Sequence, residues 1–308
     1  MESELIARLR ELLPPHPLLG LGLGDDAAVL QMTEVDECVL TVDLLTDGVD
    51  FVLAQTDARR IGRKALAVNL SDLAAMAAEP LAAVIVLALP RQIDVSTVVG
   101  FYEGLLPLAE RYGVALAGGD TNSWDGPLAI SVTALGRVVG PGPLRRDGAR
   151  PGDRIVVTGR FGGSILARHL DFEPRVREAI TLNETYNLHA GIDVSDGLSI
   201  DLAHLATESG CGAVLRPDRI PIADDAVRLA AQRGDGGTPL EHALGDGEDF
   251  ELILAVPADE ADRMVAEQPL DVPLTAIGEF VAEPGLWTVD DGGNRAELKP
   301  RGWQHEFG

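Results

Sequence analysis

The stretch Gly191-Ile192-Asp193-Val194-Ser195-Asp196-Gly197-Leu198 is central to the interpretation of the chain. In it an apolar segment is followed by two carboxylates and a hydroxyl, directly before a glycine. The leucines and alanines that follow, as far as Ala206, predict a helix with one apolar face. Asp193 and Asp196 therefore lie at a strand-to-helix turn, where two carboxylates can share one cation. Ser and Asp are also favoured helix N-caps, and a single turn of this kind is better explained by capping.

Similar acidic turns recur along the chain. Cys38–Asp43 is typical of a strand that ends in a carboxylate, and Gly118-Gly119-Asp120 follows another apolar run. Paired glycines at a strand end allow a phosphate to approach the backbone closely, although a tight turn also explains them. Gly245–Leu252 places Glu248 at the turn before a further strand. This repetition favours a shared chemical role over capping alone.

The glycine-rich stretch Gly20–Val29 contains Gly22-x-Gly24-x-x-Ala27, which fits the spacing of a dinucleotide-binding turn. We reject that interpretation, because no strand precedes it and Asp25-Asp26 stands where a pyrophosphate needs free N–H groups. We interpret the stretch as another acidic turn, with Asp26 as a candidate metal ligand.

A helix is expected over roughly residues 57–78. Within it Asn69 and Asp72 share one face, and their neighbours are too apolar for a solvent-exposed surface. An acid in such surroundings is buried and needs a partner. A cation is the favoured partner for Asp72, with a cap or a salt bridge as the alternative.

The length of 308 residues allows two domains, and the Pro/Gly-rich segment 141–152 marks the boundary. We expect an N-terminal domain over residues 1–140 and a C-terminal domain over residues 150–308. Both halves mix strands and helices, which predicts an α/β protein with α+β-like mixed sheets. Arg145 and Arg146 lie in the boundary segment, either in a solvated loop or as an arginine clamp on phosphate.

The formal net charge of −24 argues against nucleic acid or an anionic membrane as a partner. The chain has two cysteines, no basic N-terminal region, and a longest apolar run, Leu81–Pro90, of about half a membrane span. We therefore expect a cytoplasmic protein. Acidic side chains can recruit Mg²⁺, and Mg²⁺ can in turn hold phosphates.

No P-loop, protein-kinase catalytic loop, H-E-x-x-H or G-x-S-x-G motif occurs. Hard oxygen ligands without His or Cys select Mg²⁺ over Zn²⁺. Several carboxylates that each supply one or two ligands suit Mg²⁺ bound to a polyphosphate. The residues alone therefore predict phosphoryl chemistry on a nucleotide, assisted by several Mg²⁺ ions.

Five blocks carry a closer resemblance: residues 24–29, 65–76, 118–121, 193–198 and 247–252. In this order they resemble the thiamine-monophosphate kinase family of the aminoimidazole-ribonucleotide-synthetase-like ATP-binding superfamily. The resemblance runs from about residue 3 to Trp303. It implies that ATP and thiamine monophosphate give ADP and thiamine diphosphate, in a homodimer whose N-terminal domains pair through their sheets. The C-terminal domain is expected to close over the active site.

The resemblance also assigns roles to individual residues. The expected Mg²⁺ ligands are Asp26, Thr41, Asp43, Asp72, Asp120, Asp193 and Asp196. The expected ATP contacts are Tyr102, Gly119, Asp120, Arg146 and Ser195. The expected substrate contacts are Asp50, Glu248 and Trp303. No residue is expected to act as a dedicated base, because the attacking phosphate oxygen is already mostly ionised at neutral pH.

Two positions depart from the family pattern. Val42 stands where a hydroxyl residue is common, so only its backbone carbonyl could serve a cation. Asp50 replaces a common histidine, and we hypothesise that its carboxylate attracts the cationic thiazolium ring.

Other readings are weighed against this one. A purine-biosynthesis cyclo-ligase or synthetase of the same superfamily fits residues 69–74 and Trp303 less well. A selenophosphate synthetase is disfavoured, because the N-terminal Gly-rich segment has no cysteine. A non-enzymatic ATP-binding maturation or scaffold protein would have lost several acidic turns. In a merely halotolerant protein the acids would scatter over helix faces.

Overall fold

The computed structural model describes residues 12–14, 16–21, 29–30, 37–233 and 237–304. Within these ranges no helix is long and apolar enough to cross a membrane. The chain divides into two compact units. The first extends to Val138, except for Ala74–Ala77, which belong with the second unit, Val139–Gly308.

The first unit contains a four-stranded sheet of order β3-β6-β4-β5. Strand β6 is antiparallel to both β3 and β4, whereas β4 and β5 are parallel and joined through α3. The elements are β3 (Cys38–Thr46), α2 (Ala58–Ala75), β4 (Ala78–Pro90), α3 (Val95–Tyr112), β5 (Ala115–Trp124) and β6 (Ala129–Val138), with a short ribbon of β1 (Leu19–Leu21) and β2 (Val29–Leu30).

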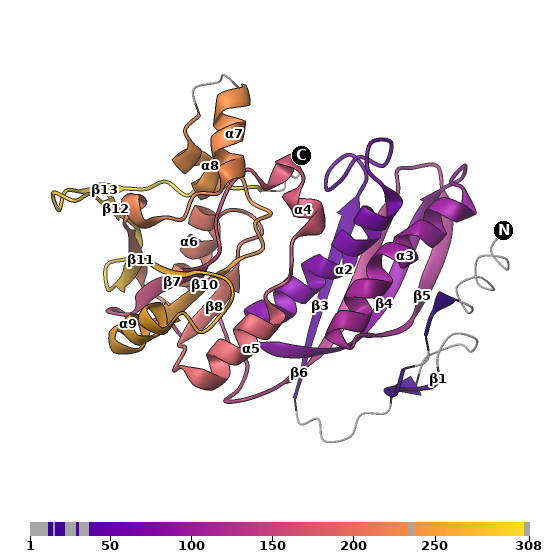
Figure 1. Cartoon of the computed structure of the whole chain (residues 1–308), viewed down its shortest axis with the longest axis horizontal. Helices are drawn as coiled ribbons and strands as arrows, with labels where there is room; N and C mark the ends of the chain where they lie inside the picture. The colour runs from indigo at the N-terminus through magenta and orange to yellow at the C-terminus, as the bar shows by residue number, and fades with distance from the viewer. Residues whose placement is uncertain (1–11, 15, 22–28, 31–36, 234–236, 305–308) are drawn as a thin grey trace. The chain divides into compact units, whose positions relative to one another are not determined.

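The two faces of this sheet differ. Helices α2 and α3 lie over one face (Figure 1), and that face holds the buried side chains. Side chains alternate between faces along a strand, so the residues between them point the other way. On β3 these are Leu40, Val42 and Leu44, which are 70%, 62% and 63% exposed, and on β4 they include Val84 and Val86. The first unit therefore presents an apolar sheet face that nothing in its described residues covers.

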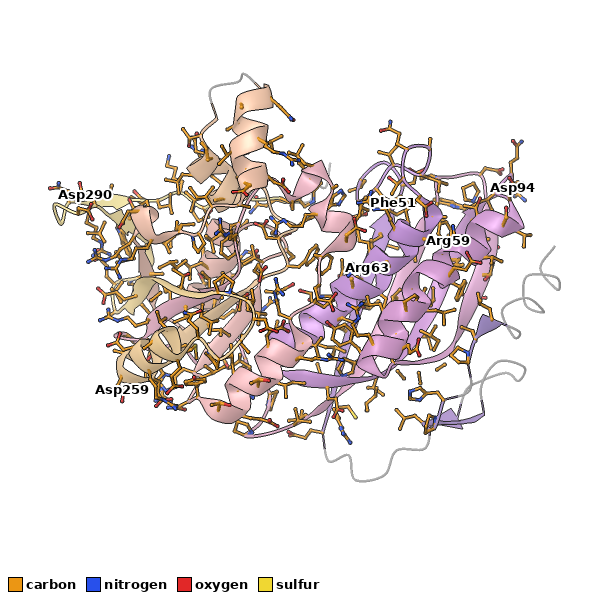
Figure 2. The ribbon with its side chains drawn as sticks, viewed as in Figure 1. Phe51, Arg59, Arg63, Asp94, Asp259 and Asp290 are labelled. Atoms are coloured by element: carbon orange, nitrogen blue, oxygen red, sulfur yellow. The ribbon has the colours of Figure 1, made fainter. Side chains whose placement is uncertain are left out.

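Helices α2 and α3 pack backbone to backbone because each supplies a glycine at the contact. A Cβ atom on Gly62 would lie 1.9 Å from the carbonyl oxygen of Phe101, and one on Gly104 would lie 1.8 Å from that of Arg59, which Figure 2 marks on α2. Only glycine permits so close an approach. Two residues that weaken isolated helices thus set the spacing of this pair.

The second unit is built on a seven-stranded sheet of order β13-β12-β9-β11-β7-β10-β8. Its strands are β7 (Arg154–Thr158), β8 (Ala190–Asp193), β9 (Gly212–Leu215), β10 (Leu252–Val256), β11 (Leu274–Val281), β12 (Gly285–Val289) and β13 (Arg295–Glu297). Its helices are η1 (Ser164–Leu166), α4 (Arg168–Asp171), α5 (Val176–Thr185), α6 (Leu198–Glu208), η2 (Pro217–Arg219), α7 (Asp224–Arg233), α8 (Pro239–Gly245) and α9 (Ala258–Glu267).

The core of the second unit lies between this sheet and helices α6 and α8. Ile155 and Val157 of β7 pack there with Leu202 of α6 and Leu244 of α8. Helix α9 contacts β7 and β11 and lies over the front of the sheet in Figure 1. At the sheet's edge Asp290 closes the turn between β12 and β13 (Figure 2). Its carboxylate accepts hydrogen bonds from the backbone N and Nδ2 of Asn294 at 2.8 and 2.9 Å.

The predicted α/β class with two mixed sheets is confirmed. Two predicted strand ends are wrong. β3 does not stop at Asp43, because it stays paired with β6 as far as Thr46. β5 does not stop at Gly118, because it runs alongside β4 as far as Trp124. Pairing with a neighbouring strand satisfies the backbone beyond the point where the residue types predict a turn.

Candidate active site

In the first unit Thr41 and Asp72 come together. The Thr41 hydroxyl on β3 donates a hydrogen bond to Oδ2 of Asp72 on α2. Asp43 lies two residues along β3, on the same face of the sheet as Thr41. Three of the predicted metal ligands therefore belong to one face, where a helix packs on a strand.

Asp50 lies in the turn that follows β3. Its Oδ2 atom accepts hydrogen bonds from the backbone N of Thr46 at 2.6 Å and from the Thr46 hydroxyl at 3.3 Å. Lys64, which is 1% exposed, donates from Nζ to the Asp50 carbonyl at 2.7 Å. One carboxylate oxygen of Asp50 thus stabilises the turn in which Asp50 lies, and the buried Lys64 ammonium binds the Asp50 backbone carbonyl.

The predicted ATP contacts of the first unit lie in different surroundings. Tyr102 is buried in α3, and burial raises the pKa of its hydroxyl to about 12. Gly119 must be glycine, because a Cβ atom would lie 1.8 Å from the Ile85 carbonyl oxygen. Asp120 is exposed and paired in register with Val86, so it lies on the exposed sheet face. That face is the opposite one from Thr41 and Asp72, and the structure does not bring Asp120 to them.

Asp26, another predicted metal ligand, lies outside the described residues.

In the second unit the turn at residues 193–198 is joined to the segment Gly245–Glu251, which we call the acidic loop. The backbone N of Glu248 donates to the Ser195 carbonyl at 2.7 Å, and that of Phe250 donates to the Val194 carbonyl at 2.8 Å. Asp193 ends β8 and is buried. These bonds bring Glu248, a predicted substrate contact, against the turn that carries Asp193, Ser195 and Asp196.

The C-terminal tail reaches the same turn. The backbone N of Trp303 donates to the Asp196 carbonyl at 2.9 Å. The Ser199 hydroxyl donates to the Arg301 carbonyl and accepts from the Arg301 backbone N, both at 2.9 Å. The Trp303 side chain remains 55% exposed. The backbone of a residue with an exposed indole is therefore held at the turn that carries Asp193 and Asp196.

Asp201 belongs to this cluster although no role was predicted for it. Its Oδ2 accepts from the backbone N of Asp196 at 3.0 Å and of Gly197 at 2.9 Å. Burial, followed by the charge of Asp193, raises the pKa of Asp201 to about 8. The sequence pattern that could have identified Asp201 is an acidic residue within an apolar helical segment, which is the pattern that identified Asp72.

The cluster suits a divalent cation. Ligand atoms of Asp196, Asp201 and His204 all lie within 4.8 Å of one another. The neighbouring negative charges that raise the pKa of Asp201 are the kind that a bound cation compensates. Carboxylate oxygens fit Mg²⁺, whereas His204 differs from the oxygen-only set that was predicted.

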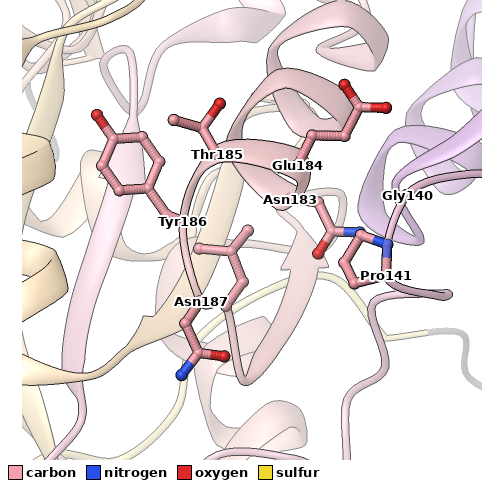
Figure 3. A pocket seen from close by; sticks show the side chains of 8 residues that line it. Gly140, Pro141, Asn183, Glu184, Thr185, Tyr186 and Asn187 are labelled. Atoms are coloured by element: carbon pink, nitrogen blue, oxygen red, sulfur yellow. The ribbon is translucent and has the colours of Figure 1, made fainter.

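Arg146, the predicted phosphate clamp, is exposed, and its carbonyl accepts a hydrogen bond from the Ser209 hydroxyl at 2.7 Å. Its neighbour Arg145 forms an ion pair with Asp147. A surface hollow of about 500 Å³ is lined by Gly140, Pro141 and residues 183–188 (Figure 3). None of the predicted site residues lines it.

The fold and the acidic turns define a class of protein. Residues 24–138 match the N-terminal domain of AIR synthase related proteins, and residues 150–290 match their C-terminal domain. The chain thus has the two-domain architecture of that family.

Individual relatives narrow the class. The chain is 43% identical to the thiamine-monophosphate kinase of Rhodopirellula baltica, over 99% of this chain and 97% of the relative. A crystal structure of thiamine-monophosphate kinase from Stenotrophomonas maltophilia K279a is 36% identical, with a TM-score of 0.77 and coverage of 94% and 95%. A structure of AaThiL complexed with AMPPCP and TMP is 28% identical, with a TM-score of 0.78 and coverage of 99% and 96%. The chain belongs to the thiamine-monophosphate kinase family.

Proposed function

We propose that this protein phosphorylates thiamine monophosphate to thiamine diphosphate with ATP as the phosphate donor. One observation within the chain carries the proposal: backbone hydrogen bonds gather Ser195, Asp196, Glu248 and Trp303 around one turn. This arrangement offers carboxylates for a metal–phosphate group and an exposed indole for an aromatic ring. Relatives named thiamine-monophosphate kinase, which align with this chain over nearly their whole length, support the proposal.

The residues are proposed to divide the work as follows. Asp26, Thr41, Asp43, Asp72, Asp120, Asp193 and Asp196 bind several Mg²⁺ ions, and Asp201 supports the turn that carries Asp196. Tyr102, Gly119, Asp120, Arg146 and Ser195 contact ATP. Asp50, Glu248 and Trp303 contact thiamine monophosphate. In this division residues 1–140 hold most of the ATP and metal ligands together with Asp50, Arg146 lies in the boundary segment, and residues 150–308 hold the remaining residues.

The chemistry needs orientation more than proton transfer. The nucleophile is a phosphate oxygen that is mostly ionised at neutral pH, so no side chain has to act as a base. Mg²⁺, when bound, offsets the repulsion between the two polyanions. The side chains hold attacking and leaving groups in line, and the phosphoryl group transfers directly. A trapped phosphorylated protein intermediate would refute direct transfer.

Asp50 is proposed to attract the positively charged thiazolium ring. Its Oδ2 accepts hydrogen bonds from Thr46, so the substrate would contact the other oxygen of the same carboxylate. The Asp50→Asn variant keeps the shape and loses the charge. We expect a higher KM for thiamine monophosphate, and an unchanged KM would count against this role.

The protein is also proposed to be a cytoplasmic homodimer. The exposed apolar face of the β3-β6-β4-β5 sheet supports pairing between two copies, because such a face is rarely left in water. This pairing would bring Asp120 to the interface. Both cysteines are free, as in reducing compartments.

The first experiment is to measure ADP release with ATP and Mg²⁺. Thiamine monophosphate, thiamine and 5-phosphoribosyl-formylglycinamidine are compared as acceptors. We expect turnover only with thiamine monophosphate, with the diphosphate as product. Turnover with the amidine would instead assign the protein to purine synthesis. No turnover with any of the three acceptors would favour another acceptor or a non-enzymatic role.

A further inference from the structure

The acidic loop has a backbone that must be held in place. Gly247, Glu248 and Phe250 have φ angles of +73°, +53° and +51°. Residues other than glycine rarely adopt this left-handed region, and they keep it only where surrounding contacts enforce it. The conformation of Glu248 is therefore set by its neighbours.

One set of neighbours comes from the segment Gly162–His169. The carboxylate of Asp249 accepts hydrogen bonds from the Gly162 backbone N at 2.9 and 3.0 Å and pairs with the Arg168 guanidinium at 2.7 Å. The Ser164 hydroxyl donates to the Gly247 carbonyl at 2.7 Å. The acidic loop is thus tied on one side to this segment and on the other to Val194 and Ser195.

The same segment reaches the Glu248 side chain. Nδ1 of His169 lies 3.2 Å from Oε2 of Glu248, and His169 is only 7% exposed. The Glu248 side chain keeps 29% of its surface exposed. Adjacent residues of α4, Arg168 and His169, therefore hold adjacent acids of the loop. A buried imidazole thus contacts the carboxylate of a Glu248 side chain that remains partly exposed to solvent.

We propose that His169 is a positioning residue that orients the Glu248 carboxylate toward the cationic thiamine moiety. The inference rests on the proposed function, in which Glu248 contacts that substrate. His169 itself touches Glu248 and not the reacting phosphates. Its loss should weaken binding of thiamine monophosphate and leave ATP binding and the chemical step intact.

The test is a set of steady-state measurements on the full-length protein. For His169→Leu we expect the KM for thiamine monophosphate to rise about tenfold, because the polar contact between Nδ1 and the Glu248 carboxylate is lost. The KM for ATP and kcat should stay within about twofold. His169→Asn places an amide N–H near the position of Nδ1 and should restore most of the affinity. If the leucine variant does not fold, His169→Ala replaces it.

A matched control is available in the same unit. His189 also pairs with a carboxylate, at 2.8 Å from Asp153, and is similarly buried. His189→Leu should leave both KM values unchanged. A double-mutant cycle completes the test: in a Glu248→Gln background, His169→Leu should add little to the KM for thiamine monophosphate.

The outcomes separate the two claims. If the wild-type protein does not phosphorylate thiamine monophosphate, the proposed function and this inference both fall. If it does, and His169→Leu shifts both KM values and kcat together or shifts none of them, only the role of His169 is overturned. Full additivity with Glu248→Gln would overturn it as well.

Discussion

The backbone N of Trp303 donates a hydrogen bond to the carbonyl of Asp196, at 2.9 Å. The two residues are far apart in the sequence, and the bond joins the C-terminal tail to the turn that ends β8. A second anchor, between Ser199 and Arg301, holds the tail on α6. These bonds hold the backbone of the tail at the turn that carries Asp196.

We predict that Trp303→Ala raises the KM for thiamine monophosphate about tenfold, because the substrate loses an aromatic surface on which to stack. The KM for ATP should not change, and Trp303→Phe should retain most of the affinity. Steady-state kinetics with each substrate varied separately measures this. Trp287→Ala is the control, since it removes an indole of β12 that packs under the Arg295 guanidinium of β13. Equal effects from both variants would contradict the prediction.

Asp196→Asn is expected to lower kcat by about a hundredfold, because it removes a carboxylate from the group that suits Mg²⁺. The Mg²⁺ concentration for half-maximal rate should rise as well, and titration of the rate with MgCl₂ measures it. Asp259→Asn, at the exposed start of α9 (Figure 2), should change neither quantity. An Asp196→Asn enzyme with normal Mg²⁺ dependence would remove Asp196 from the metal set.

The exposed sheet face gives a prediction about assembly. Leu44→Lys places a charge on the exposed face of β3, near its C-terminal end. We expect it to convert a dimer into monomers at micromolar concentration, because burying an unpaired ammonium is unfavourable. Light scattering after gel filtration reports the mass. Val227→Lys, on α7, is the matched control, because Val227 is also more than half exposed. A Leu44→Lys protein with the wild-type mass would argue against pairing through this face.

Asp249 should make the stability of the protein depend on pH. Burial raises its pKa to about 7, although Arg168 and the Gly162 N–H oppose the shift. An unfolded Asp titrates at about 3.9, so the folded protein binds this proton more tightly. The contribution of Asp249 to the free energy of unfolding therefore falls as the pH rises from about 4 to about 7.

The Asp249→Asn variant isolates this contribution, because its amide is neutral at every pH. We expect the stability of the wild type relative to the variant to fall with rising pH, by up to about 1.4 kcal/mol per pH unit. Urea unfolding at pH 5, 6, 7 and 8 measures it. For Asp259→Asn the difference should stay flat over this range. If the wild type gained stability relative to Asp249→Asn as the pH rose, the pairing with Arg168 would outweigh burial.

Much of the architecture was readable from local patterns. The helix expected over roughly residues 57–78 corresponds to α2, and the glycine after Asp196 marks the junction of β8 and α6. The predictions failed where pairing with a neighbour prolongs a strand, as at Asp43 and Asp120. Hydrogen bonds to another strand depend on which strand lies alongside, and no local pattern contains that information.

The sequence by itself determined the acidic turns, the α/β class and the residue types that suit Mg²⁺ and phosphate, because these depend on side-chain chemistry and short-range spacing. Only the tertiary structure decided which of them meet. It joins Glu248 to Ser195, Trp303 to Asp196 and His169 to Glu248, and it places Asp120 on the sheet face away from Asp72. Such contacts link distant segments whose closure is opposed by chain entropy and stabilised by packing of the whole unit, so neighbouring residues alone do not specify them.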